Sequence, residues 1–192
     1  GSRLVIEQDL EPRIVELSKM MPKPDPAATH RRFTQNNMKQ IGLALHNYHD
    51  AMGRFPTNIV DAKGKPILSW RVELLPYIEQ NVLYQQIDRK LAWNEGKNKT
   101  VSEVHISTFS STPNDGKTMP AKTRFLAPKS KDGILYAEKP AKITDIPDGT
   151  SNTLFFVQVA EDQAKNWMEP DDWEPNAKDI LKGVLDEKLG GF

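Results

Sequence analysis

NNMKQIGLALHNYHD, residues 36–50, is the stretch of sequence that decides the fold. Its apolar side chains recur at helical spacing and share one face: Met38, Ile41, Leu45 and Tyr48. Polar residues fill the other positions, so the pattern predicts an amphipathic helix that begins at Thr29 or a little earlier and continues to Asp50. Gly53 follows where a left-handed residue can close the helix. The sequence therefore predicts one long helix with a single buried stripe.

A separate leading segment, residues 1–28, is expected before this helix. Gly1-Ser2 is typical of the remnant of a cleaved fusion tag. Four apolar residues at helical spacing predict an amphipathic helix: Leu10, Ile14, Leu17 and Met21. The proline run at 22–26 lacks the amide hydrogens that a helix needs and predicts a stiff extended connector. Residues 29–192 then follow as a single domain.

A turn and further helical segments are expected after the long helix. Phe55-Pro56 favours extended backbone, and Asp61–Lys65 predicts a turn between two strand-like pieces. Ser69 is placed to cap a third helix. The side chains expected on the buried side of that helix are Trp70, Leu74, Tyr77, Ile78 and Leu83. Pro76 interrupts the hydrogen-bond ladder, so we expect two helical segments there.

Beyond about Trp93, short apolar runs alternate with Pro, Gly, Asn and Asp, and this pattern predicts strands. The expected strands are Val104–Phe109, Thr123–Ala127, Ile134–Ala137 and Thr153–Val159. Helices that precede strands indicate an α+β domain, in which a long N-terminal helix packs on a small antiparallel sheet with extra short helices. The acidic tail from Asp162 is expected to be loop-like, with a weak helical patch over Asp179–Leu185.

Composition excludes several classes of protein. The 192 residues are 38% hydrophobic and 27% charged, which suits one globular domain. Lys+Arg and Asp+Glu both number 26, so no excess positive charge is available to bind nucleic acid. The absence of cysteine removes disulfides, thiolate zinc sites and cysteine nucleophiles. The apolar runs are far shorter than a bilayer span, so we expect no membrane insertion.

Two histidines of the long helix are possible zinc ligands. His46 and His49 lie three residues apart beside Asp50 and so share roughly one face. Catalytic zinc normally takes three protein ligands, and no third histidine lies nearby in the sequence. The sequence favours the alternative, in which the histidines hydrogen-bond the following turn and fix the end of the helix.

Residues 145–153 gather oxygen-bearing side chains around a glycine. Asp145, Asp148 and Asn152 are possible calcium ligands, because calcium prefers hard oxygen donors. The same residue types around Gly149 are those of tight turns, and their spacing is not that of an EF-hand. The sequence therefore favours a structural turn. The acidic run at 169–174 offers further ligands or, more commonly, solvated charge.

Aromatic side chains offer a possible site for a sugar or another small solute. Trp167 and Trp173 are the better candidates, because their polar neighbours indicate exposure. Other aromatic residues could line such a surface: Trp70, Trp93, Tyr77, Tyr84 and Tyr136. Most aromatic side chains, however, pack in protein cores. The sequence has no nucleophile elbow, phosphate-binding glycine loop or zincin helix, so it does not predict an enzyme.

Three ordered blocks of the sequence closely resemble the signature of a large bacterial family. The blocks are residues 36–50 followed by GRFP at 53–56, LSWRVELLPYIEQ at 68–80 followed by Leu83-Tyr84, and DGTSNT at 148–153. The family is domain of unknown function 1559, abundant in planctomycetes and also labelled solute-binding family 10. The resemblance spans about residues 31 to 175. It implies a pseudopilin-like fold, often behind a prepilin-type cleavage and methylation signal, in the cell envelope, the periplasm or outside the cell.

The chain departs from the family pattern at both ends. The stretch before Arg31 is amphipathic and broken by prolines, where many members have a prepilin signal and a long apolar helix. The chain ends at Leu189-Gly190-Gly191-Phe192, whereas members usually continue into a closing strand with an Asp-Gly-Ser pattern. We therefore expect residues 29–192 to lack a closing C-terminal strand and to expose a sheet edge.

The leading hypothesis is a non-enzymatic, pseudopilin-like structural or protein-interaction domain without a cofactor, which meets protein partners or a second copy. Its structural motif residues are Asn36, Asn37, His46, His49, Asp50, Trp70, Asp148, Gly149 and Asn152. Among them Asn36, Asn37, His46, His49 and Asn152 are expected to be buried or half-buried and to hydrogen-bond loop backbone. The alternative is a binding module for a small solute or carbohydrate, built on Trp167, Trp173 and the turn at Asp148.

Overall fold

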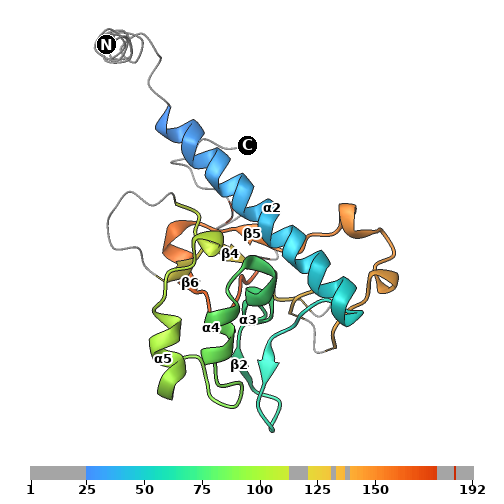
Figure 1. Cartoon of the computed structure of the whole chain (residues 1–192). Helices are drawn as coiled ribbons and strands as arrows, with labels where there is room; N and C mark the ends of the chain where they lie inside the picture. Colours follow the sequence, from blue (N-terminus) through green and yellow to red (C-terminus); the bar gives the residue numbers. More distant parts are fainter. Residues whose placement is uncertain (1–24, 113–120, 131–132, 137–138, 177–183, 185–192) are drawn as a thin grey trace, which may run out of the picture.

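The computed structural model describes residues 25–112, 121–130, 133–136, 139–176 and 184 (Figure 1). The predicted helix at Leu10–Met21, most of the proline connector and nearly all of the weak helical patch at Asp179–Leu185 lie outside the described residues. The expected lack of a closing C-terminal strand also falls there.

The predicted long helix is confirmed as α2, Pro26–Met52. It begins three residues before Thr29, because the Asp25 side chain accepts a hydrogen bond from the Ala27 amide and Pro26 occupies the first helical position. Gly53 closes the helix as expected, with φ of 69° and its amide donating to the His49 carbonyl.

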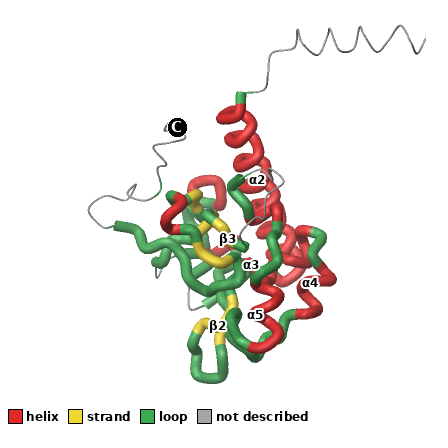
Figure 2. The backbone as a smooth tube through the Cα atoms, turned by 90° about the vertical axis from the view of Figure 1, so that its left-hand side faces the viewer, coloured by secondary structure: helices red, strands yellow, loops and turns green. Residues whose placement is uncertain are grey.

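One stripe of α2 is buried, as the spacing predicts. The buried residues of the helix are Thr34, Asn37, Ile41, Ala44, Leu45 and Tyr48. They lie chiefly against three short helices, η2 (Ser107–Phe109), η1 (Leu75–Ile78) and α3 (Arg71–Leu74). The first turns of α2 extend beyond the rest of the described chain in both views (Figures 1 and 2).

The third predicted helix is divided, as expected from Pro76, but into three segments and not the expected two. Its parts are α3, η1 and α4 (Asn81–Gln86). Pro76 lies in the first turn of η1, where its missing amide hydrogen costs no helical bond. The cap position of α3 is Trp70 rather than Ser69, although the Ser69 hydroxyl accepts a bond from the Arg71 amide. A further helix, α5 (Gly96–Ser102), was not predicted.

The strands form three two-stranded antiparallel ladders. They are β1 (Ile59–Val60) with β2 (Pro66–Leu68), β3 (Lys122–Thr123) with β6 (Lys165–Asn166), and β4 (Phe125–Leu126) with β5 (Val157–Gln158). The predicted turn between the first pair is present, and the Asp61 carboxylate accepts the amides of Lys63 and Lys65. The α+β prediction is confirmed, with a sheet smaller than the apolar runs suggested.

Three of the predicted strands are wrong in whole or in part. Val104–Phe109 ends in the 3-10 helix η2, because Asn37 on α2 binds carbonyls at both ends of that turn. Residues 134–136 form a turn, and β5 is only two residues long within Thr153–Val159. The two aromatic residues before β5 fill the core instead of pairing, with Phe155 on Phe55 and Phe156 on Phe125.

Residues 125–127 separate two hydrophobic clusters. Phe125 and Ala127 belong to the main core, together with the buried stripe of α2, whereas Leu126 belongs to a second cluster with Trp173. This alternation follows from extended backbone, in which successive side chains point to opposite faces. The helices and the strands therefore share one main core.

Candidate functional site

α2 is held to the body by buried polar contacts on its inner face. The Asn37 Nδ2 donates to the carbonyls of Ser107 and Ser110, at 2.7 and 2.9 Å, and the Thr34 hydroxyl donates to the Ser111 carbonyl. Asn37 is 5% exposed and Ser110 4% exposed, so the buried amide of Asn37 is satisfied by carbonyls of the chain. The expectation for Asn37 agrees with this geometry.

The outer face of α2 is open and lacks acidic residues until its last turn. No Asp or Glu occurs from Pro26 to His49, and the exposed positions include Arg31, Arg32 and Lys39. Leu43 lies among these polar residues and is 63% exposed. Asn36 and His46 are also exposed, which contradicts their expected burial; both lie on the side of the helix opposite Ile41.

Two of the three histidines of α2, His46 and His49, lie beside Phe55. The rings of His46 and His49 lie 6.1 and 4.8 Å from the ring of the fully buried Phe55, measured between centroids. The His49 Nε2 accepts the Ile143 amide, and its Nδ1 lies 3.7 Å from the exposed Asp50 carboxylate. His49 thus has a structural role, but its partner is the backbone of Ile143, 94 positions further along the chain, and the expected bond to the turn after the helix is wrong.

The oxygen-rich turn at 145–153 uses its side chains locally. The Asp145 carboxylate accepts the Lys142 amide at the start of η3 (Ile143–Asp145). The Asn152 Nδ2 donates to the Asp148 carbonyl, and Gly149 has φ of 73° before η4 (Thr150–Asn152). Asn152 is exposed, contrary to its expected burial, because its bond lies within this surface turn. These contacts fit the expected tight turn.

Trp167 and Trp173 are core residues, and the expectation that they are exposed is wrong. They are 1% and 4% exposed. Trp167 stacks on Phe109 and donates its indole N–H to the Val104 carbonyl. Their polar sequence neighbours do not indicate exposure, because Lys165, Asp171 and Asp172 form ion pairs within the fold. A surface for sugars cannot be built on these two indoles.

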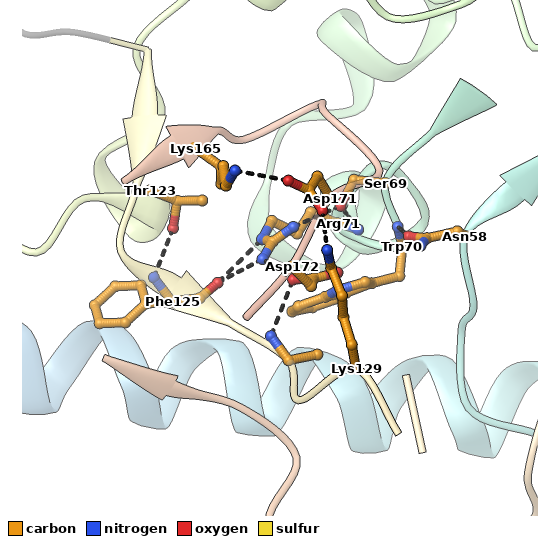
Figure 3. Close-up of polar contacts among 11 residues, drawn as sticks. Asn58, Ser69, Trp70, Arg71, Thr123, Phe125, Lys129, Lys165, Asp171 and Asp172 are labelled. Carbon is orange, nitrogen blue, oxygen red and sulfur yellow. Dashed lines mark hydrogen bonds and ion pairs between the residues drawn. The ribbon is translucent and has the colours of Figure 1, made fainter. Parts of the chain in front are cut away.

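The chief polar centre of the interior is an ion pair that the sequence did not reveal (Figure 3). The Arg71 Nη2 lies 2.7 Å from the Asp172 Oδ1, and both side chains are completely buried. The guanidinium also donates to the Phe125 carbonyl and the Ser69 hydroxyl. Its carbon lies 4.4 Å from the centroid of the Trp70 ring. These contacts join α3, β4 and the segment that contains Asp172.

The carboxylate of Asp172 completes this centre. It accepts the Ala127 amide at 2.9 Å and the indole N–H of Trp70 at 3.2 Å, in addition to Arg71. Burial raises the pKa of Asp172, and the charge of Arg71 opposes that shift. Because its oxygens are occupied by partners of this chain, the centre is an architectural one that ties residues 165–173 to α3.

Asp171, the residue before Asp172, lies between two lysines (Figure 3). Its oxygens are 2.5 Å from the Lys129 Nζ and 2.6 Å from the Lys165 Nζ. Burial raises the pKa of Asp171, but the hydrogen bonds and charges of the two lysines outweigh it and lower that pKa. The acidic run at 169–174 is therefore only partly solvated charge, since Asp171 and Asp172 are engaged within the fold.

Within the described part of the chain, no three His, Asp or Glu side chains gather closely enough to hold a metal ion. Among the helices of the described residues, none is both long enough and apolar enough to cross a bilayer.

Comparison with known proteins assigns the chain to a family. The family model described as "Protein of unknown function (DUF1559)", with the short name SBP_bac_10, matches residues 28–189. No curated protein and no solved structure matches the chain significantly. The matched region runs from the first turns of α2 through the buried Arg71–Asp172 centre. The chain therefore belongs to the DUF1559 family of proteins of unknown function.

Proposed function

We propose that this chain is a non-enzymatic, pseudopilin-like interaction domain of the cell envelope or the exterior, and that α2 is the element it presents. The observation that carries this proposal is the asymmetry of α2. Its inner stripe is anchored by Asn37 and the core, whereas its first turns extend beyond the body. The projecting first turns of α2 would be marginally stable as a separate helix, so the anchored part of α2 must stabilise them.

The partner of α2 could be a second copy of this chain, and purified protein is enough to test such self-association. Leu43 is an exposed apolar side chain on the polar outer face of α2, where a second copy would cover it. We expect sedimentation velocity to show reversible association as concentration rises, and Leu43→Glu to weaken it. Val82→Glu is the matched control, because Val82 is 74% exposed and belongs to another helix, α4.

A protein that remains monomeric at every concentration would remove self-association from the proposal. A different partner is then sought by cross-linking from α2. The chain has no cysteine, so Asn36→Cys offers a single reactive thiol on the outer face, with Lys63→Cys on the β1–β2 turn as its control. Adducts of equal yield from both positions, or from neither, would contradict a role for α2.

The envelope location rests on the resemblance to pseudopilins, and subcellular fractionation of the producing cells tests it. Recovery of the protein in the cytosol alone would contradict it. The alternative of solute binding has lost its two favoured residues, since Trp167 and Trp173 are buried. The family's short name is the remaining hint of that alternative.

A further inference from the structure

Three of the four tyrosines of the chain lie on elements that contact one another; Tyr48 is buried, and Tyr77 and Tyr84 are half-buried. Tyr48 comes from α2, Tyr77 from η1 and Tyr84 from α4. The rings of Tyr48 and Tyr77 lie 5.8 Å apart between centroids, at 73°. Contacts of η1 with both α2 and α4 bring the three side chains together. The ring of Tyr48 therefore packs edge-on against the ring of Tyr77, and Tyr84 comes from the neighbouring helix α4.

An acidic side chain belongs to the same group. Glu73 extends from α3, and its side chain is only 11% exposed. Burial, followed by the charge of Glu73, raises the pKa of both Tyr48 and Tyr84. Glu73 and Tyr84 are joined through Arg89, which contacts both side chains. We call Glu73, Tyr48, Tyr77 and Tyr84 the tyrosine–glutamate cluster. It combines a largely enclosed carboxylate with aromatic faces, the combination that attracts organic cations.

A cation of the chain itself already lies in the cluster. The guanidinium of Arg89 forms an ion pair with the Glu73 carboxylate and donates to the Tyr84 hydroxyl at 2.9 Å. Its carbon lies 5.8 Å from the centroid of the Tyr84 ring. Arg89 follows α4, and its side chain is 45% exposed, so solvent reaches the guanidinium that Glu73 binds. Arg54 is the other cation that acts on Tyr48.

We propose that the tyrosine–glutamate cluster is a binding site for the guanidinium group of a ligand, and that Arg89 is a tethered occupant which this ligand displaces. The guanidinium side of this ion pair is 45% exposed, and exchanging one guanidinium for another keeps the Glu73 carboxylate paired, so the exchange costs little. Glu73 cannot be left alone, because a nearly enclosed carboxylate without a cation is costly. The site therefore always holds a cation, from this chain or from a ligand.

The ligand chemistry fits two sources, a free guanidinium compound or an arginine side chain of a partner protein. Both present the same planar fork to Glu73 and the same cation to the tyrosine rings. Ethylguanidinium and an arginine-containing peptide separate them. Similar dissociation constants indicate a small-molecule ligand, whereas much tighter binding of the peptide indicates a partner protein. Either result supports the site itself.

The test removes the tethered occupant and adds a free one. Arg89→Ala is titrated with ethylguanidinium chloride, with sodium chloride at equal ionic strength as the reference, and the tyrosine ring signals are followed by NMR. We expect saturable shifts of these signals and a dissociation constant at least about tenfold lower than in the unaltered protein, where Arg89 competes. Lys90→Ala, which changes an exposed neighbouring cation, should behave like the unaltered protein.

A double variant decides whether Glu73 is the partner. Arg89→Ala combined with Glu73→Gln should lose the saturable response. The proposal is overturned if Arg89→Ala responds no better than Lys90→Ala, or if the double variant still binds. Should Arg89→Ala fold poorly, Arg89→Gln keeps the length of the side chain without its charge. These outcomes are independent of the role proposed for α2, because Leu43 lies outside the cluster.

Discussion

At the scale of single residues, the neighbours Asn36 and Asn37 show how one step along a helix separates surface from interior. They differ by about 100° around the helix axis. Asn37 is therefore buried against η2, where it donates to two carbonyls, while Asn36 faces solvent. The same amide side chain has a structural role at one position and is available for contact at the other.

We predict that Asn37→Ala lowers the free energy of unfolding by about 1–3 kcal/mol, because the carbonyls of Ser107 and Ser110 lose a buried donor. Asn36→Ala should change it by less than about 0.5 kcal/mol, as is usual for surface substitutions. Urea unfolding of both variants measures the difference. Equal losses would show that the bonds to η2 do not stabilise the fold.

The charge of Asp171 should make the stability of the fold depend on pH. Lys129 and Lys165 lower its pKa despite burial, so the folded protein favours the ionised carboxylate more than the unfolded chain does. This stabilisation is present above the ordinary pKa of an aspartate and is lost as pH falls through the lowered folded value. Asp171→Asn should therefore be less stable than the parent at neutral pH, and the difference should shrink toward pH 2.

Urea unfolding at pH 7 and at about pH 2 checks the sign of this effect. Asp162→Asn is a suitable control, because Asp162 is exposed and its loss should leave the pH dependence almost unchanged. A difference between Asp171→Asn and the parent that grows on acidification would contradict the assignment of the two lysines as the dominant partners.

At the scale of elements, segment 165–173 joins parts of the fold that are distant in sequence. Its first residues form β6 against β3, its Met168 carbonyl accepts the Ser69 amide, and Asp172 binds Arg71. Trp173 then pairs with Ala127 and Lys129 through backbone bonds. The segment therefore closes both hydrophobic clusters, and the buried ion pair fixes where it passes α3.

We predict that Arg71→Met lowers the free energy of unfolding by about 3–5 kcal/mol, because it leaves the buried Asp172 without its cation. Adding Asp172→Leu should recover part of the loss, since the unpaired buried charge is removed as well. Arg31→Met is the control: its pair with Asp25 is 3.9 Å long and exposed, so the change should be about 1 kcal/mol or less.

Thermal or urea unfolding of the three variants and the parent tests this account. A double variant that is less stable than Arg71→Met by a further full increment would mean that Asp172 acts mainly through Trp70 and Ala127. In that case the contact with Arg71 would be secondary.

At the scale of the whole molecule, the chain combines a compact core with one projecting helix. The core is formed by α2, the short helices and residues 125–127, and it is satisfied by contacts within the chain. Among the described residues, we propose binding at the outer face of α2 and at the tyrosine–glutamate cluster. The first would bind a protein, and the second would bind an organic cation.

Metal dependence is a property of the whole molecule, and we predict none. Asp145 caps η3 and Asn152 bonds the Asp148 carbonyl, so binding calcium would break local bonds of the turn. His49 Nε2 is likewise engaged with the Ile143 amide. Thermal unfolding curves with excess calcium, with excess zinc and with a chelator should superimpose. A rise of several degrees with calcium would instead assign Asp145, Asp148 and Asn152 as ligands; a rise with zinc would assign His46 and His49.

The sequence by itself determined what depends on local periodicity and on single special residues. The stripe of α2 follows from the 3.6-residue repeat, Gly53 from its tolerance of positive φ, and the break at Pro76 from its missing amide hydrogen. The family blocks led to the same helix-first α+β domain. In each case the cause and the effect lie within a few residues of one another, so a single sequence contains enough information.

Only the tertiary structure decided which polar and aromatic residues are enclosed. Arg71 and Asp172 are 101 positions apart, and neither has a local signal that predicts burial. Trp167 and Trp173 have polar neighbours in the sequence but apolar neighbours in space. The strand expected at 104–109 follows the same rule, because Asn37, 70 positions before Ser107, binds the carbonyls of Ser107 and Ser110. Burial is set by contacts between distant segments, which local pattern does not encode.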